Sequence, residues 1–460
     1  MIKFSKTCLC ILLIVCLGQM HLMAQDAKKK RWWRAEEAQN TTTPAKVIHL
    51  DLSAENLTEI PDWIYRFKNL RKIDLSENQI SLIPKKLNQL KKLYFLKLES
   101  NVVLGKKAAL LKNIKAKYRS KLRELKSGGG NKEKIQQELK DLSKKMSELW
   151  NDSDKGSKPI TLTFERCKYI KELNLSNSLL TELPPSIKKL KRLRILILDK
   201  NRFEKLPPAL AKLRRMRKLS VSFNQLHQLD NIKLRKLRRL RELRLVDNKL
   251  TELPDDICKL RRLRRLNLSK NQLTTLNPEL KRLRRMRELV LYKNKLADLP
   301  KAFYRLKRLQ TLDQGHNQVK KISPQIAKFR RLQTLYLSFN KINTLPSELG
   351  NITTLKKLYM HHNALLGIPK SLAKLQNLTV FHANNNELLV FPQEIIEMKK
   401  LEDINLAHNH LESYDQRIAQ LPHLKILYIH HNKLNKDDAS YDPYHQLFDQ
   451  LRAREVIVTD

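Results

Sequence analysis

Hydrophobic residues recur in one fixed pattern along most of the chain. The stretches that begin at Leu70, Leu240 and Leu332 read LRKIDLSENQISLIP, LRELRLVDNKLTELP and LQTLYLSFNKINTLP. Each follows the pattern L-x-x-L-x-L-x-x-N-x-L-x-x-L-P. Leucines at alternate positions are typical of a short strand with one face turned inward. The Leu-Pro pair then begins a return segment, where the fixed φ and missing N–H of proline are tolerated.

The asparagine of this pattern recurs every 23 residues, with one gap of 24 and one long interruption. It occupies positions 78, 101, 201, 224, 248, 271, 294, 317, 340, 363, 386, 409 and 432. Glu55 and Ser178 take the same place in two further units, so the chain has about 15 repeats. Because each coil returns the chain beside the previous one, we expect a parallel sheet held together by contacts between neighbouring coils. We also expect each Asn amide to bond backbone groups of its own coil and of the next.

This pattern resembles the leucine-rich repeat family with 23-residue repeats and Leu-Pro turns, to which Ras-suppressor-like, plant intracellular Ras-group and many bacterial proteins belong. The resemblance covers about residues 47–435. It implies an α/β fold, a leucine-rich repeat solenoid shaped as a curved horseshoe with a parallel concave sheet, that binds protein or glycan partners. The chain departs from extracellular members capped by cysteine clusters, and its repeats are longer than those of the bacterial ubiquitin-ligase effectors.

The pattern also divides the chain into segments. We predict a signal peptide over 1–24, a flexible basic lead over 25–46, repeats over 47–104, an inserted helical hairpin over 105–158, repeats over 159–436 and a C-terminal cap over 437–460. The tryptophans of the lead are expected either to contact a membrane interface or to cover the first repeat. The hairpin is expected because apolar residues recur at three- and four-residue steps on both sides of Gly128-Gly129-Gly130. Its role stays open between a decorative loop and an arm that docks a partner. In the cap we expect a short helix near 444–454 and an extended end at 456–458.

The first segment has the three parts of a secretory signal. Lys3 and Lys6 precede an apolar run over 8–17, which is too short to span a bilayer of about 30 Å, and Ala24 precedes the expected cleavage site. An uncleaved membrane anchor is the alternative. Cleavage leaves no transmembrane span in the mature chain and leaves Cys167 and Cys258, which lie about four repeats apart, too far for a disulfide. We therefore expect an exported protein, periplasmic, cell-surface or secreted, and the resemblance together with the missing disulfides favours a bacterial source.

Positive charge is concentrated before the strands. The chain has 92 Lys and Arg against 46 Asp and Glu, a formal charge of +46. Segments such as LRRMRKL place pairs of basic residues outward, and we name these pairs the basic edge. Its candidate residues for binding a polyanion are Arg214, Arg215, Arg238, Arg239, Arg261, Arg262, Arg284 and Arg285.

Arginine binds phosphate, sulfate and carboxylate through two parallel hydrogen bonds, so this edge favours an anionic partner. A merely solvated edge is the alternative. For an exported protein, lipopolysaccharide phosphates or acidic polysaccharides fit better than nucleic acid, which such contacts would bind without sequence specificity.

The concave face of repeats 10–15 carries aromatic and amide side chains where earlier repeats mostly carry Ser, Asp, Lys and Asn. Aromatic and amide groups on a rigid sheet suit sugar stacking or the anchoring of a peptide. The alternative is that these residue types are common at these positions of the repeat and have no binding function. The candidate ligand-binding residues are Tyr336, Phe339, Tyr359, His361, His362, His382, Asn384, Asn385, Asn405, His408, Tyr428 and His430.

The sequence predicts neither catalysis nor a cofactor. It contains no Gly-rich phosphate loop, no G-x-S-x-G and no H-E-x-x-H motif. His408 and His431 lie on adjacent strands, near enough to share an ion, but no carboxylate or Cys completes a tetrahedral set, so we predict no metal. We expect a non-catalytic binding protein for a protein or glycan. A nonspecific polyanion binder is one alternative, and an intracellular signalling scaffold is another if the N-terminus is not exported. The identity of the partner and the oligomeric state stay open.

Overall fold

The computed structural model describes residues 32–103, 132–150, 158–159, 161–230, 232–433 and 443–459, together with single positions between 114 and 125. The predicted signal peptide lies outside these residues. The chain divides into two compact units, residues 1–202 and 203–460. In the part of the chain that the structure describes, no helix is long and apolar enough to cross a membrane.

Short parallel strands form the sheet of the first unit. They are β1 (Trp32–Arg34), β2 (His49–Asp51), β3 (Lys72–Asp74), β5 (Phe95–Lys97), β9 (Glu172–Asn174) and β10 (Ile195–Ile197), paired in this order. In each repeat strand the middle residue is apolar and fully buried, as Ile73 and Leu96 are. The alternation of inward and outward side chains predicted from the leucine spacing is confirmed.

The insertion leaves the register of this sheet intact. Strand β5 pairs directly with β9, although 77 residues separate Asn101 from Ser178. Strands β6 (Val102–Val103) and β7 (Lys158–Pro159) pair antiparallel, so the two ends of the insertion lie side by side. Strands β4 (Leu82–Ile83) and β8 (Thr163–Phe164) form a further parallel pair.

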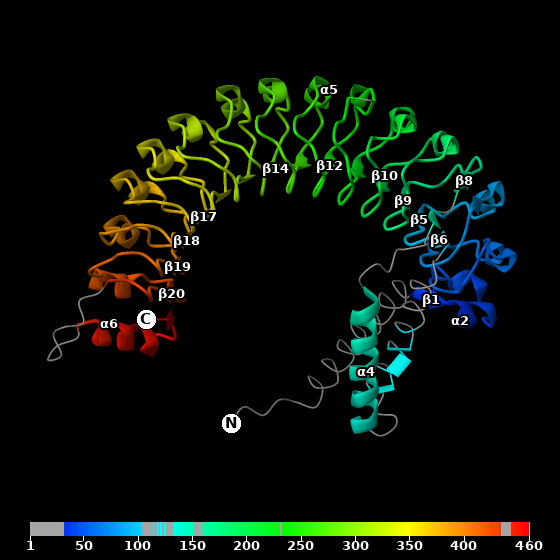
Figure 1. Ribbon diagram of the computed structural model, residues 1–460, viewed down its shortest axis with the longest axis horizontal. Helices are drawn as coiled ribbons and strands as arrows, with labels where there is room; N and C mark the ends of the chain where they lie inside the picture. The colour runs from blue at the N-terminus through cyan, green and yellow to red at the C-terminus, as the bar shows by residue number, and fades with distance from the viewer. Residues whose placement is uncertain are drawn as a thin grey trace, which may run out of the picture. The chain divides into compact units, whose positions relative to one another are not determined.

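Helix α4 (Lys132–Trp150) occupies the second half of the predicted hairpin (Figure 1). Its residues Ile135 and Leu139 are buried, as the apolar seam of the sequence requires. Lys121 Nζ lies 2.9 Å from Glu138 Oε2, which ties the first half of the insertion to α4. Most of the first predicted helix lies outside the described residues.

The flexible lead predicted over residues 25–46 is wrong for residues 32–46. They form β1, helix α2 (Ala35–Gln39) and the 3₁₀ helix η1 (Pro44–Lys46), and β1 pairs with β2. The ring of Trp32 lies 5.4 Å from that of His49, and Ala38 is fully buried. The first coil has an open sheet edge and an open apolar end, and this segment covers both.

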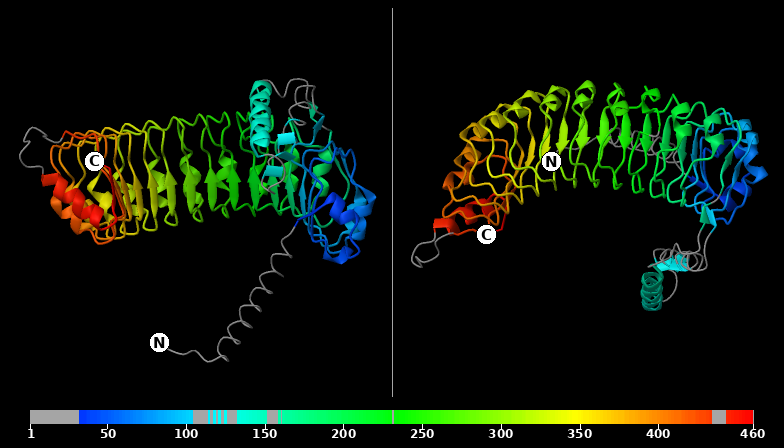
Figure 2. Two further views of the ribbon diagram at one scale, coloured as in Figure 1. Left: turned by 90° about the horizontal axis from the view of Figure 1, so that it is seen from below. Right: turned by 45° about the horizontal axis from the view of Figure 1, so that its top comes forward.

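The second unit continues the same architecture. Its parallel strands pair in chain order, with the strands on one side of the unit and the short helical segments on the other (Figure 1), and Figure 2 shows the strands side by side. The strands are β11 (Lys218–Ser220), β12 (Glu242–Arg244), β13 (Arg265–Asn267), β14 (Glu288–Val290), β15 (Thr311–Asp313), β16 (Thr334–Tyr336), β17 (Lys357–Tyr359), β18 (Val380–His382), β19 (Asp403–Asn405), β20 (Ile426–Tyr428) and β21 (Ile457–Thr459).

The return segments are mostly 3₁₀ helices that begin at or just after the Leu-Pro turn. In the first unit these are η2 (Asp62–Arg66), η3 (Lys85–Gln89) and η4 (Pro185–Lys189). In the second unit they are η5 (Pro208–Lys212), η6 (Leu234–Lys236), α5 (Asp255–Cys258), η7 (Pro278–Arg282), η8 (Lys301–Arg305), η9 (Pro324–Lys328), η10 (Ser347–Asn351), η11 (Lys370–Lys374), η12 (Gln393–Glu397) and η13 (Gln416–Gln420). Proline fits here because the first N–H groups of a helical turn have no partner within it.

The asparagines form a ladder of buried amides. Asn271 Nδ2 donates to Leu268 O at 2.9 Å in its own coil and to Leu245 O at 2.9 Å in the preceding coil. Its Oδ1 accepts the N–H of Leu250 at 3.1 Å, also in the preceding coil. The expectation of bonds to the next coil is therefore wrong in direction, because each amide reaches back. Ser178 keeps part of the ladder, since its Oγ donates to Ser176 O at 3.0 Å.

The residue before each ladder position has a positive φ. This φ angle is between 53° and 55° at Phe339, His362, His408 and His431. Side chains at this position therefore leave the backbone in the same direction on every coil.

A helix and a strand follow the last repeat coil at the C-terminal end. Helix α6 (Pro443–Ala453) packs on η13, and β21 pairs with β20. Its residues Leu447 and Leu451 are buried, so the last coil of the repeat array does not end on an open apolar surface. The leucine-rich repeat solenoid predicted from the sequence is confirmed within each unit.

Candidate functional site

The sheet register brings the central outward residues of the later repeats into one row. Tyr336 lies opposite Tyr359, Tyr359 opposite His382, His382 opposite Asn405, and Asn405 opposite Tyr428. All five side chains are partly exposed on the face of the sheet. The structure therefore brings together the predicted residues of this row, from strands β16 to β20.

The tyrosines of this row form a stack. The rings of Tyr336 and Tyr359 lie 4.7 Å apart and nearly parallel, at 6°. The ring of His382 then meets Tyr359 edge-on, at 5.1 Å and 88°. Burial, followed by the nearby charge of Asp313, raises the pKa of Tyr336, so its hydroxyl stays protonated and can donate a hydrogen bond. The two tyrosines therefore present adjoining ring edges and hydroxyl tips on the face of the sheet.

A second row of rings runs beside the first. The rings of His316 and Phe339 stack at 3.9 Å, and those of Phe339 and His362 stack at 4.1 Å. These residues each precede a ladder Asn, and the shared positive φ explains why their rings lie parallel. Tyr292 extends the row, edge-on to His316 at 4.8 Å.

We call the combined rows the aromatic cluster, and two of its members were not among the predicted site residues. Tyr292 and His316 belong to earlier coils, and extending the outward columns back by one or two repeats would have found them. The aromatic cluster consists of Tyr292, His316, Tyr336, Phe339, Tyr359, His361, His362 and His382.

Polar groups under the aromatic cluster have shifted pKa values. Burial, and then the proximity of His362, lowers the pKa of His361 to about 4, so this ring is neutral near pH 7. Its Nδ1 shares a hydrogen bond of 2.9 Å with Ser338 Oγ. Burial raises the pKa of Asp313 to about 6, although its Oδ1 accepts the N–H of Gly315. His382 Nε2 lies 3.0 Å from Asp403 Oδ1.

The remaining predicted residues form a separate group. Asn384 and Asn385 follow the aromatic cluster along the sheet and are partly exposed. Beyond them, His408, His430 and His431 lie together, with their ring nitrogens within 4.8 Å of one another, and we call these three the histidine cluster. The concave surface predicted as one site therefore divides into two groups of rings with amides between them.

The basic edge is exposed along its length and lines two open grooves. All eight of its predicted arginines are exposed. One groove, with a volume of about 640 Å³, is lined by Arg235, Arg238, Arg239, Lys259, Arg261 and Arg262. Another, of about 760 Å³, is lined by Lys281, Arg282, Arg284, Arg285, Arg305, Lys307 and Arg308.

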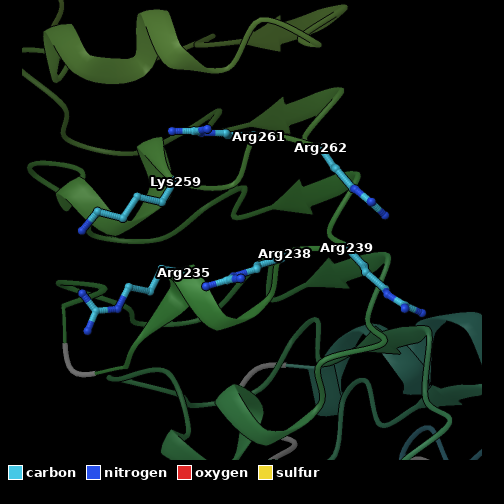
Figure 3. A pocket seen from close by; sticks show the side chains of 6 residues that line it. All are labelled: Arg235, Arg238, Arg239, Lys259, Arg261 and Arg262. Atoms are coloured by element: carbon cyan, nitrogen blue, oxygen red, sulfur yellow. The ribbon is translucent and has the colours of Figure 1, made fainter.

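In two of the basic pairs the members do not point the same way (Figure 3). Figure 3 shows Arg238 and Arg261 directed toward the helical segments, while Arg239 and Arg262 lie on the side of the strands. In these two coils the edge predicted as a single stripe is therefore divided into two rows (Figure 3). Arg264 also lies among like charges, since desolvation and then the charges of Arg287 and Arg241 lower its pKa.

One acid neutralises part of this positive face. The side chain of Glu242 is 5% exposed, and its carboxylate pairs with Lys218 at 3.0 Å, with Arg244 at 2.7 Å and with Arg265. Burial raises the pKa of Glu242, but Arg265 and Lys218 outweigh this effect and the net pKa is lowered. The carboxylate is therefore ionised near pH 7 and is already occupied.

The two cysteines of the repeats offer no reactive thiol. Cys167 and Cys258 are both buried and unpaired, as predicted. Burial raises the pKa of each thiol to about 11, which removes the thiolate needed for nucleophilic attack or metal binding near pH 7.

Parallel strands stacked coil by coil and closed by a ladder of amides define a repeat solenoid, a class of binding scaffold. The family described as leucine rich repeat matches residues 46–103, 191–250, 238–296 and 376–434, and the leucine-rich repeat region matches residues 277–384. The chain belongs to the leucine-rich repeat family. A comparison with curated proteins finds no match.

Solved structures agree with this assignment. A leucine-rich repeat protein of Leptospira interrogans is 26% identical, with a TM-score of 0.69, over 94% of this chain and 100% of that one. The Toll–Spätzle complex of Drosophila matches at 20% identity and a TM-score of 0.61, over 86% of this chain and 49% of that one. An internalin of Listeria monocytogenes matches at 19% identity and a TM-score of 0.51, over 82% and 85%.

Proposed function

We propose that the protein is an exported binding scaffold that recognises a protein or glycan partner through the aromatic cluster. The family supports a binding role, since leucine-rich repeat proteins are in general scaffolds rather than enzymes. One of the similar structures is itself a complex of Toll with Spätzle. Export rests on the N-terminal signal pattern, and mass measurement of the mature N-terminus tests it: a first residue at Gln25 supports export, and an intact Met1 contradicts it.

The stacked pair Tyr336 and Tyr359 carries the proposal for the aromatic cluster. Two rings stacked 4.7 Å apart on a rigid sheet present their adjoining edges and hydroxyl groups, which suit edge-to-face contact with a planar side chain and hydrogen bonds to sugar hydroxyls. Because adjacent strands hold them in register, little conformational entropy is lost when a ligand packs on them.

The experiment compares capture by the wild type and by a triple variant, Tyr336→Ala, Tyr359→Ala and His382→Ala. The probes are an array of neutral and acidic glycans and an envelope extract. We expect the variant to lose at least about tenfold in capture with a nearly unchanged melting temperature, because these side chains lie on the outward face.

A matched control changes three exposed residues on the outer segments of nearby coils. The variants are Ser347→Ala, Lys370→Ala and Gln393→Ala, which leave the aromatic cluster intact. Equal loss in this control, or full capture by the triple variant, contradicts the proposal.

A second candidate function is nonspecific binding of an anionic polymer such as lipopolysaccharide or an acidic polysaccharide. The two grooves of the basic edge support it, because every side chain that lines them is Arg or Lys. Such clustering of like charges costs free energy that an anionic partner recovers. Binding of this kind weakens steeply as salt rises.

Heparin serves as the probe for this candidate. Replacing Arg214, Arg238, Arg261 and Arg284 by Glu is expected to move elution to much lower salt. The control places the same charge change on exposed lysines away from the grooves, with Lys320, Lys321, Lys341 and Lys370 replaced by Glu. If both variants elute together, only net charge matters and the grooves are not the site.

A further inference from the structure

The histidine cluster is a closed triangle of three imidazoles. The rings of His408 and His431 stack at 4.3 Å, His430 meets His408 edge-on at 5.2 Å, and His430 meets His431 at 5.0 Å. His408 follows strand β19, and the other two residues follow β20, the next strand of the sheet. The backbone that carries them is fixed by the ladder, since Asn409 and Asn432 close these two coils.

His430 is not one of the two histidines that the sequence predicts to lie near each other. It occupies the neighbouring outward column, and the repeat spacing relates only residues within one column. The strand exits bring the two columns together, so that a ring nitrogen of His430 lies near those of His408 and His431.

A hydrogen bond orients the ring of His430. Its Nδ1 lies 2.9 Å from Thr459 Oγ1 on strand β21. When Nδ1–H donates to that hydroxyl, Nε2 carries the free lone pair. Metal-binding histidines are commonly held in this way, with the other ring nitrogen bonded to a neighbouring group.

The distances suit a small ion after modest rotation of the rings. Metal–nitrogen bonds of about 2.0–2.1 Å in a tetrahedral site place ligand nitrogens about 3.4 Å apart. The three nitrogens already lie within 4.8 Å of one another. His408 and His431 are exposed, so their side chains can rotate without disturbing the core.

We propose that His408, His430 and His431 bind a divalent transition-metal ion of the Zn²⁺, Co²⁺, Ni²⁺ or Cu²⁺ class. Imidazole nitrogen suits these ions and not Mg²⁺ or Ca²⁺, which take oxygen ligands. Water supplies the remaining position, because the three protein ligands leave the solvent side open. The bound ion joins the last two repeat coils and, through Thr459, the capping strand β21. This inference is independent of the partner proposed for the aromatic cluster.

The test titrates the untagged full chain with Co²⁺, whose visible d–d absorption reports four-coordinate nitrogen ligation, and then displaces Co²⁺ with Zn²⁺. One ion per chain is expected. The variants are His408→Asn, His431→Asn and His430→Ala, because Asn tolerates the positive φ of the first two positions. Each is expected to weaken binding at least about tenfold, and Thr459→Val about tenfold, through loss of the orienting bond.

The matched control is His423→Ala, an exposed histidine that precedes β20 in the chain and lies outside the cluster. It should bind Co²⁺ like the wild type. Melting temperatures measured with a chelator show whether each metal-free variant is folded, and only folded variants are compared. A wild type without a four-coordinate spectrum overturns the proposal. So does equal weakening by His423→Ala, or unchanged binding in the His430→Ala variant.

Discussion

The concave face of the second unit carries two chemically different regions on one backbone frame. Strands β11–β14 present charged groups around the buried carboxylate of Glu242, whereas strands β15–β20 present stacked rings. Both regions use three-residue strands with a buried middle residue, and both are closed by the same ladder of amides. The inward positions therefore determine the frame, and the outward positions vary independently of it. The surface chemistry, not the fold, must decide what each region binds.

The largest loss of stability is expected from a substitution in the asparagine ladder, which both regions share. Asn317 Nδ2 donates to Leu291 O and Gln314 O at 3.0 Å, and its Oδ1 accepts the N–H of Leu296 at 3.0 Å. Asn317→Ala leaves these buried backbone groups without partners and should lower the free energy of unfolding by about 3–5 kcal/mol. Denaturant unfolding measures this loss.

The neighbouring substitution Gln318→Ala is the control for Asn317→Ala. Its side chain is exposed, so we expect a change within about 0.5 kcal/mol. Equal destabilisation by the two variants would show that the ladder amide contributes nothing specific, and both regions would then need another common support.

A smaller loss of stability is expected from a substitution that changes only the charged region. Glu242→Gln removes the anion that Lys218, Arg244 and Arg265 share, and should cost about 2 kcal/mol at pH 7, reduced from the buried-pair value because the partners are partly exposed. Retention on heparin should increase at the same time.

The pH dependence of this loss has a defined sign. The folded pKa of Glu242 is depressed, so the stabilising contribution is complete above the unfolded value of about 4.3 and is lost as the pH falls through the lower, folded pKa. Wild type and variant should therefore converge in stability in acid, which urea unfolding at pH 3 and pH 7 checks. A constant difference across that range contradicts the role given to the carboxylate.

The smallest change in stability is expected from a substitution of Asp313, where the aromatic region begins. Its pKa is raised to about 6 in the folded protein, so ionisation above that pH opposes folding, and the wild type loses stability as the pH rises from about 4 to 6. Asp313→Asn keeps the acceptor for the N–H of Gly315 and should gain about 1–2 kcal/mol at pH 8 and nothing at pH 3.5. Thermal melts at the two pH values measure it, and a gain at pH 3.5 would point to another cause.

Much of the fold could be predicted because it depends on inward positions that repeat. The leucine and asparagine spacing indicates strand register, buried residues such as Ile73 and the place of the ladder. It does not indicate that each amide bonds the preceding coil, because sequence spacing has no direction. It leaves open whether the segment with Trp32 and Ala38 covers the first coil, since a segment used once has no period to reveal it.

The candidate site could be predicted only in part. The rows of Tyr336, Tyr359 and His382 follow from counting in steps of the repeat. The ring contact between His430 and His408 brings residues of two outward columns together. Arg238 and Arg239 are adjacent in sequence, but their side chains point to opposite sides (Figure 3). Both depend on side-chain direction at the edges of the strands, which the repeat spacing alone does not contain.

The backward reach of the ladder has a consequence for how the protein is made. A ribosome delivers the N-terminal coils first, and each new asparagine completes the turn of the coil already emerged, as Asn340 does for Val319. The chain therefore emerges and completes its coils in the same direction. At any moment only the coil that emerged last lacks the asparagine of the following coil. A chain of this length can in this way fold coil by coil from its N-terminal end as it emerges, without waiting for its far end.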